Sequence, residues 1–191
     1  GNWESTDPAV RAVNINTTEP VTIVNSHLRG PGDLIVALTG SNVTIQQSCF
    51  VSTNPNVTGK AKGTPVHAFQ SANVVVTNCD FEGGGFYGIW IQQYTGDHSP
   101  KNTIKIHNNR IHNVDGRFSD GRGGYLTNQD GGCHGIHLSN VYGVPGIEIA
   151  WNQIINAPYQ SGGEIDLINI YESSGTSASP MQIHDNYLQG E

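Results

Sequence analysis

A short motif that returns six times along the chain is the feature that most limits its fold. Each copy has two apolar residues separated by one other residue, and a third apolar residue follows five positions after the second. Successive copies begin about 22 to 43 residues apart, near the periods of solenoid proteins. Alternation with period two predicts β-strands, and constant units joined by variable loops are typical of stacked coils. The copies are Val21–Leu28, Val43–Phe50, Val74–Phe81, Ile104–Ile111, Ile147–Ile154 and Met181–Leu188.

Each motif contains two short strands joined by a bend, and a further strand signal precedes it. One coil therefore holds three short strands, and the strands that precede the motifs form what we call the upstream sheet. Each strand can pair in parallel with its equivalent in the next coil. The sequence therefore predicts an all-β protein, a single-stranded parallel β-helix with three sheets and about six coils, forming one domain over residues 1–191. By this register His67 points inward, as a hydrogen-bonded core residue. The inward pairs of the upstream strands are Val13 and Ile15, Val36 and Leu38, His67 and Phe69, Ile89 and Ile91, Ile136 and Leu138, and Ile168 and Ile170.

The bend inside the motif predicts a ladder of polar side chains. An Asn side chain tolerates left-handed backbone and can hydrogen-bond the equivalent amide of the next coil, so these residues are assigned a structural role. The bend positions are Ser26, Ser48, Cys79, Asn109, Asn152 and Asn186. The apolar residues after the bend, predicted to be core, are Phe50, Phe81, Ile111, Ile154 and Leu188.

Composition excludes some classes of partner. Nine Lys and Arg against sixteen Asp and Glu give a net charge of −7, which argues against nucleic acid, whose phosphates need clustered basic residues. No apolar run approaches the roughly 20 residues of a membrane span. Cys49 and Cys79 fall on neighbouring copies one residue out of register, so buried thiols are favoured over a disulfide. With Cys133 the number of cysteines is odd.

Segments such as Asn73–Phe81, Gly88–Ile91 and Gly135–Leu138 resemble right-handed parallel β-helix repeats of the pectate-lyase-like superfamily. The resemblance extends over most of the chain and implies a polysaccharide groove along the upstream sheet. The segment Cys133–Ser139 also resembles the Gly-His-Gly-Ile/Leu-Ser element of polygalacturonase-type hydrolases. The family's catalytic carboxylates would lie on the coils beside it, where Ala68 and Trp90 stand, so that activity is not carried over. Neither end shows a cap, which predicts a piece of a longer chain or assembly through the ends.

Two outward rows of the upstream sheet supply the candidate site. The first row is expected to run through Asn14, Ala37, Ala68, Trp90, His137 and Asn169, and the second through Asn16, Thr39, Gln70, Gln92, Ser139 and Tyr171. Trp90 offers an aromatic face for a sugar ring. His134 is expected beside Asp166, either as a general base held by a carboxylate or as part of a hydrogen bond that orders a loop.

The long loop from Asn113 to Gly132 enters this sheet beside His137. Arg117 and Arg122 are expected either to clamp a uronate carboxylate or to pair with Asp residues of the same loop. Those Asp and Asn oxygens suit Ca²⁺, but Asp-Gly is also an ordinary turn, so no metal ligands are assigned. On the next sheet, Lys105 beside Glu148, with His107 nearby, is predicted to be a solvated charge pair of little value.

These observations favour a secreted, extracellular, carbohydrate-active protein whose partner is a polysaccharide. If it is a polyuronide lyase, His137 accepts the proton and Arg122 or Arg117 neutralises the substrate carboxylate. The residues expected to line subsites are Trp90, Gln92, Asn169 and Tyr171. Hydrolysis is the other reaction considered. The alternative from another class is a non-catalytic scaffold, adhesin or carbohydrate-binding protein, favoured by the absence of the known catalytic signatures.

Overall fold

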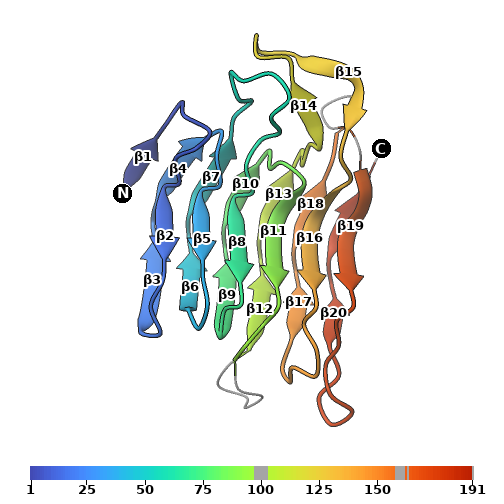
Figure 1. The fold of residues 1–191 in the computed structure, drawn as a ribbon. Helices are drawn as coiled ribbons and strands as arrows, with labels where there is room; N and C mark the ends of the chain where they lie inside the picture. The colour runs from blue at the N-terminus through green and yellow to red at the C-terminus, as the bar shows by residue number, and fades with distance from the viewer. Residues whose placement is uncertain (97–102, 158–161, 163, 191) are drawn as a thin grey trace.

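Stacked strands build the protein, and Figure 1 shows their coils running side by side from the first to the last. The structure, a computed structural model, describes residues 1–96, 103–157, 162 and 164–190. Three sheets are formed from parallel pairs, as expected when equivalent strands of successive coils meet. Among these residues no helix has the length and apolar character needed to cross a membrane.

Each sheet takes one strand from each coil. Sheet A, in spatial order, consists of β1 (Asn2–Glu4), β4 (His27–Gly30), β7 (Cys49–Ser52), β10 (Asp80–Glu82), β13 (Arg110–His112), β18 (Gln153–Ile155) and β21 (Tyr187–Gln189). Sheet B consists of β2 (Val13–Ile15), β5 (Ile35–Ala37), β8 (Val66–Phe69), β11 (Tyr87–Gln92), β16 (Cys133–Ser139) and β19 (Glu164–Tyr171). Sheet C consists of β3 (Pro20–Val24), β6 (Asn42–Gln46), β9 (Asn73–Thr77), β12 (Ile104–His107), β17 (Glu148–Ala150) and β20 (Gln182–His184).

The long loop forms an extra hairpin, which projects beyond the stack in Figure 1. Its antiparallel strands are β14 (Arg117–Ser119) and β15 (Tyr125–Asp130). Thus the largest insertion between two motif copies adds structure outside the coils and leaves the pairing of β11 with β16 intact.

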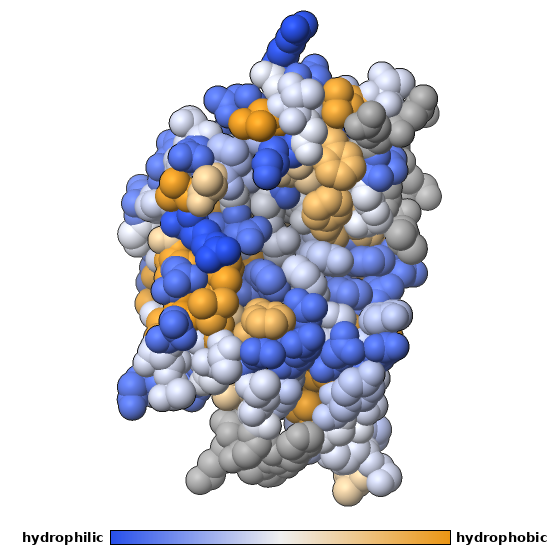
Figure 2. All heavy atoms as spheres, in the orientation of Figure 1, coloured by the Kyte–Doolittle hydropathy of each residue, from blue (hydrophilic) through white to orange (hydrophobic). Residues whose placement is uncertain are grey.

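The core fills the space between the three sheets. Phe50 and Phe81 are fully buried and stack with ring centroids 4.8 Å apart, and Ile111 and Ile154 are also fully buried, as predicted. Leu188 is 47% exposed, so its assignment to the core was wrong; it lies on β21, the edge strand of sheet A. The face shown in Figure 2 is largely hydrophilic, with hydrophobic residues gathered toward the early coils.

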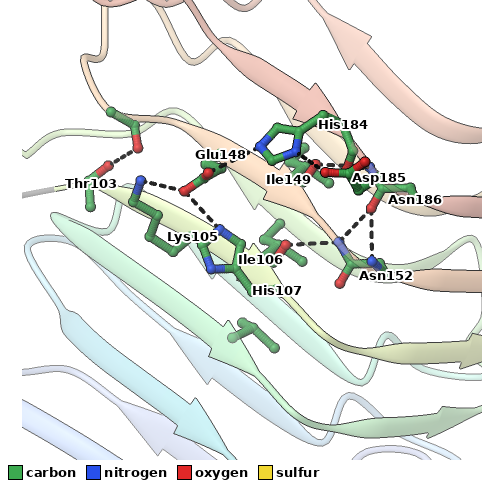
Figure 3. Close-up of polar contacts among 12 residues, drawn as sticks. Thr103, Lys105, Ile106, His107, Glu148, Ile149, Asn152, His184, Asp185 and Asn186 are labelled. Atoms are coloured by element: carbon green, nitrogen blue, oxygen red, sulfur yellow. Dashed lines mark hydrogen bonds and ion pairs between the residues drawn. The ribbon is translucent and has the colours of Figure 1, made fainter.

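The predicted ladder at the bend between sheets C and A is confirmed. The Asn152 side-chain oxygen accepts a hydrogen bond from the Asn109 backbone N–H at 3.1 Å, and its side-chain NH₂ donates to the Ile106 carbonyl at 2.8 Å. The Asn186 side chain accepts from the Asn152 amide at 2.9 Å (Figure 3). Earlier in the stack the Cys79 amide donates to the Asn109 side chain at 3.0 Å. Buried backbone groups at each bend therefore find partners in the next coil.

Cys49 and Cys79 do not form a disulfide, as predicted, and Cys133 is not bridged to either of them. Cys79 and Cys133 are buried, and Cys49 is half-buried. Cys49 pairs with Asp80 across the sheet, which leaves Cys79 one position out of register with it. Burial raises the pKa of the Cys79 thiol to about 11, so this thiol is protonated and unreactive near neutral pH.

The predicted register of sheet B was wrong in the early coils. His67 lies beside Trp90 and Val36, whereas Ala68 lies beside Ile91. His67 therefore belongs to the outward row, and its predicted place in the core was wrong. The reason lies in β5, whose three residues are all apolar and buried, because a strand without alternation does not specify which side faces the core.

Candidate functional site: the aromatic row of sheet B

Five ring side chains form a continuous row on the outer surface of sheet B. His67 of β8 stacks on Trp90 of β11, with centroids 4.0 Å apart and planes 6° apart. Tyr87 of β11 lies 4.6 Å from Trp90 and 4.9 Å from His137 of β16. His137 in turn stacks on His134 at 5.0 Å. We call these residues the aromatic row.

The rings of the aromatic row stack on one another, so most ring faces are covered. Trp90 has His67 against its ring and Tyr87 close by, and its Nε1 donates to the Ser139 hydroxyl at 3.2 Å. The open indole face expected at Trp90 is therefore occupied by neighbouring rings. A ligand lying along sheet B meets ring edges, which carry the positive end of the ring quadrupole and the polar nitrogen atoms.

A groove of about 570 Å³ lies beside the aromatic row, toward the early coils. Its walls come from loops that lead into sheet B, and three of the nine basic residues of the chain line it, Arg11, Lys60 and Lys62. One acidic residue, Asp33, is part of the same lining. Its aromatic lining residues are His67, Phe86, Tyr87, Trp90 and Phe118.

Sequence reasoning placed the groove on the later coils and missed several of these residues. Tyr87 lies beside His134 in the strand register, so extending the predicted pairing of His134 by one coil would have found it. Arg11 and Lys60 lie on irregular segments outside the motif, and no signal in the sequence links them to the sheet.

The predicted pairing of His134 with Asp166 is confirmed. Their Cα positions are in register, and His134 Nδ1 lies 3.6 Å from Asp166 Oδ2 and 3.3 Å from the Asp166 carbonyl oxygen. Asn169 donates to the same Asp166 carboxylate at 2.6 Å. Asp166 Oδ2 is thus shared between the Asn169 amide and the His134 imidazole, and this contact helps to fix the ring orientation of His134.

His137 lies beside Trp90 and Asn169 as predicted, but it is not an exposed residue. Its exposed fraction is 8%, and its Nδ1 is buried without a hydrogen-bond partner. Burial, together with the nearby His134, lowers the pKa of His137 to about 4. Its imidazole is therefore neutral at physiological pH and a weak base.

The two arginines of the long loop have different surroundings. Arg117 donates to the buried Asp115 carboxylate at 2.7 and 3.0 Å and lies 3.9 Å from the Tyr125 ring. The alternative in which Arg117 pairs with an Asp of its own loop is thus the one observed. Arg122 is exposed, in a turn where Asp120 accepts its backbone amide at 2.7 Å.

Two of the three carboxylates of this loop, those of Asp115 and Asp120, are held by other groups of the protein. Asp115 contacts Lys62 and Arg117, and Asp120 accepts two backbone amides of an ordinary turn. Within the described parts of the chain, no group of three His, Cys, Asp or Glu side chains is arranged to hold a metal ion. The remaining predicted residues, Gln92 and Tyr171, are each in register with Ser139, at the far end of the strands.

Comparison with known families agrees with the coil geometry. Residues 49–188 match the family described as right handed beta helix region. The chain belongs to the right-handed β-helix family. The fold predicted from the motif is confirmed, with about six to seven coils, and it places the chain in the pectate-lyase-like superfamily.

Two curated relatives come from Aspergillus niger, a probable endopolygalacturonase D and an endopolygalacturonase D. Each is 30% identical over 132 residues, which make up 66% of this chain and 21% of the relative. The chain thus spans about a fifth of the length of these relatives. No solved structure matches it significantly.

Proposed function

We propose that this β-helix protein binds an acidic polysaccharide of the polygalacturonate class along sheet B. The observation that carries the proposal is that Arg11 and Lys60 line the same groove as His67, Tyr87 and Trp90 of the aromatic row. A protein with net charge −7 would repel a polyanion unless its cations were gathered at the contact. Cations attract uronate carboxylates, while tyrosine, tryptophan and imidazole edges contact sugar rings and hydroxyl groups.

The relatives support this substrate class, since their names denote enzymes that act on polygalacturonate. Gln92, Asn169 and Tyr171 lie on the same sheet as Trp90, and we propose that they extend the binding track beyond the groove. Arg122, on the exposed hairpin turn, is proposed as a further cation for a uronate group. A partner of this kind lies outside cells, and we accordingly place the protein outside the cell.

Replacing Arg11 and Lys60 together by glutamine is expected to raise the Kd for oligogalacturonate about tenfold. Each exposed charge contributes on the order of 0.5–1 kcal/mol, and about 1.4 kcal/mol corresponds to a factor of ten. Isothermal titration calorimetry at low and high salt measures the effect, which should shrink as salt screens the charges. Arg29→Gln, which removes an exposed cation from sheet A, is the matched control. Equal affinity of wild type and double variant would contradict the proposal.

A second candidate function is cleavage of the bound chain at His134, favoured by the contact of this imidazole with Asp166. Hydrolysis by the usual route needs two carboxylates, whereas the register neighbours of His134 are Tyr87 and Asp166. The arrangement fits β-elimination better. One ring nitrogen faces Asp166 and the other takes the proton from C5 of the uronate. The C–H electrons form the C4–C5 double bond as the C4–O bond breaks, and the leaving oxygen is protonated from water.

His134→Gln is expected to lower the rate of chain cleavage about 100-fold or more, as is typical for loss of a general base. The ultraviolet absorbance of the unsaturated product measures elimination, and a reducing-end assay detects hydrolysis. His137→Gln is the comparison variant, because His137 is the other imidazole proposed as proton acceptor. Product formation by the His134 variant together with loss of activity in the His137 variant would reassign the base. No product from wild type would leave a binding protein without catalysis.

A further inference from the structure

A second row of exposed residues follows the bend between sheets C and A, away from the aromatic row. Each coil places one residue with positive φ at this bend. Five of the six are Asn, Gln or Asp, and among these Asn and Asp adopt this conformation readily. The residues are Asn25 (φ 49°), Gln47 (50°), Asn78 (54°), Asn108 (56°), Trp151 (56°) and Asp185 (52°). We call them the bend row.

Trp151 departs from the residue type that the bend row uses elsewhere. A bulky side chain at positive φ is an outlier, and such residues persist where the surroundings require them, often at functional sites. Trp151 is also 49% exposed, so core packing does not explain it. A strained, solvent-facing indole in place of an amide therefore points to a contact made with a ligand.

The surroundings of Trp151 hold its ring in place. Ala150 lies between His107 and His184 in the strand register of sheet C, and this small side chain leaves room beside the two imidazoles. The imidazoles lie 5.5 and 5.2 Å from the indole, at interplanar angles of 77° and 86°. The indole thus has an imidazole from the preceding coil and another from the following coil as fixed neighbours.

Glu148 orients both imidazoles (Figure 3). Its carboxylate lies 2.9 Å from Lys105 Nζ, 3.1 Å from His107 Nε2 and 3.1 Å from His184 Nε2. The hydrogen bonds from Lys105 and His184 lower the pKa of Glu148 to about 2. The predicted pair of Lys105 with Glu148, with His107 nearby, is present, and His184 of the following coil joins it to make a four-residue network. This network fixes the two imidazoles in advance of ligand binding, which reduces the ordering cost.

A hollow of about 550 Å³ follows the same bend through the first four coils. Asn25, Gln47, Asn78 and Asn108 all line it, and Trp151 occupies the next position of the bend row. Coils repeat about every 4.8 Å, so uncharged amides recur at regular intervals along the axis. An amide both donates and accepts hydrogen bonds, which suits a row of hydroxyl groups and offers no charge to an anion.

We propose that the bend row is a second polysaccharide-binding site, which takes a neutral, hydroxyl-rich glycan chain. Trp151 stacks on one sugar ring, and the amides of the earlier coils bond hydroxyl groups of the following sugars. This site lies on the bend between sheets C and A and not in the sheet B groove, and five of the twelve residues that line its hollow are Asn or Gln. The hollow's two charged lining residues, Arg110 and Asp80, lie 3.9 Å apart and balance each other. The protein thereby holds acidic and neutral polysaccharides on different faces.

Trp151→Asn tests the second site, because asparagine is the residue that the bend favours and the variant is expected to fold at least as stably as wild type. The probes are galactan, xylan and hydroxyethyl cellulose, with polygalacturonate as the acidic comparison, in native affinity gels. Wild type should be retarded by at least one neutral polymer. The variant should show at least tenfold weaker retardation by that polymer and unchanged retardation by polygalacturonate. Tyr142→Asn removes another exposed aromatic ring, with an exposed fraction of 56% against 49% for Trp151, and should change the retardation by neither polymer.

Two results would overturn this inference. One is wild-type protein that no neutral polymer retards, and the other is a Trp151 variant that binds the neutral polymer as wild type does. Both are independent of the sheet B proposal, which stands or falls on polygalacturonate binding by the Arg11 and Lys60 variant. If Trp151→Asn lost binding of polygalacturonate but kept binding of the neutral polymer, the acidic chain would be placed on the bend row instead.

Discussion

Replacing Asp115 by alanine is expected to lower the free energy of unfolding by about 3–5 kcal/mol, the usual cost of removing one partner from a buried ion pair. The Asp115 side chain is fully buried, and it contacts Lys62 at 3.1 Å and Arg117 at 2.7 Å. Both cations are themselves largely shielded from solvent. Without the carboxylate they are left with uncompensated charge at the base of the β14–β15 hairpin.

Urea unfolding followed by circular dichroism measures the loss at Asp115. The matched control is Glu4→Ala, which breaks the exposed Glu4–Arg29 pair at 3.1 Å and should cost less than about 1 kcal/mol. A loss below about 1 kcal/mol for the Asp115 variant would show that this network contributes little to stability.

The same variants should differ in their response to acid. Burial by itself raises the pKa of Asp115, but the hydrogen bonds from Arg117 and the charge of Lys62 outweigh it and hold the pKa below its ordinary value. A carboxyl with a lowered pKa in the folded state adds stability above its unfolded pKa of about 4 and loses it as pH falls through the folded value. The unfolding free energy of wild type should therefore fall below about pH 4. In Asp115→Ala the part of this fall that is due to protonation of Asp115 should be missing.

Replacing Phe81 by alanine is expected to cost about 3–5 kcal/mol, the range for truncating a large aromatic side chain in a core. Phe81 is fully buried and stacks on Phe50 of the preceding coil, with planes 10° apart. Its removal leaves a cavity between two coils whose backbones are held together by sheet hydrogen bonds. The neighbouring coils cannot close around such a cavity without breaking register.

Thermal and urea unfolding of the Phe81 variant measure this cost. Phe81→Leu should recover much of it, because leucine refills part of the volume. Tyr142→Ala, at a ring that is 56% exposed, should stay within about 0.5 kcal/mol of wild type. Equal stabilities for Phe81→Ala and Tyr142→Ala would mean that the core relaxes fully around the lost ring.

The motif was enough to predict the register of sheets A and C. Val43 pairs with Val74, and Phe50 with Phe81, as the superposed copies require. In these strands the alternation of apolar residues with Thr decides which side chains face the core. The bend residues then fix the position at which each strand ends. In sheet B the pairings of Trp90 with His137 and of His134 with Asp166 were also predictable, because their strands alternate over several residues.

The aromatic row and the basic groove could be predicted only in part. His67 was misplaced because the short, wholly apolar β5 beside it does not define which side faces inward. The network around Glu148 was underestimated because His184 reaches it from the following coil. The spacing of residues along the chain predicted which residues are neighbours on adjacent strands. It did not predict which of their side chains contact the Glu148 carboxylate.

The coil can be predicted from the repeated motif, since a constant motif with variable spacing has few folds that satisfy every backbone hydrogen bond. Which loop residues pack beside sheet B is seen only in the folded protein. Arg11 and Lys60 are 49 positions apart by number, yet they line one groove. The physical reason is that strand pairing depends on local periodicity, whereas loop packing depends on contacts between coils that no periodicity encodes.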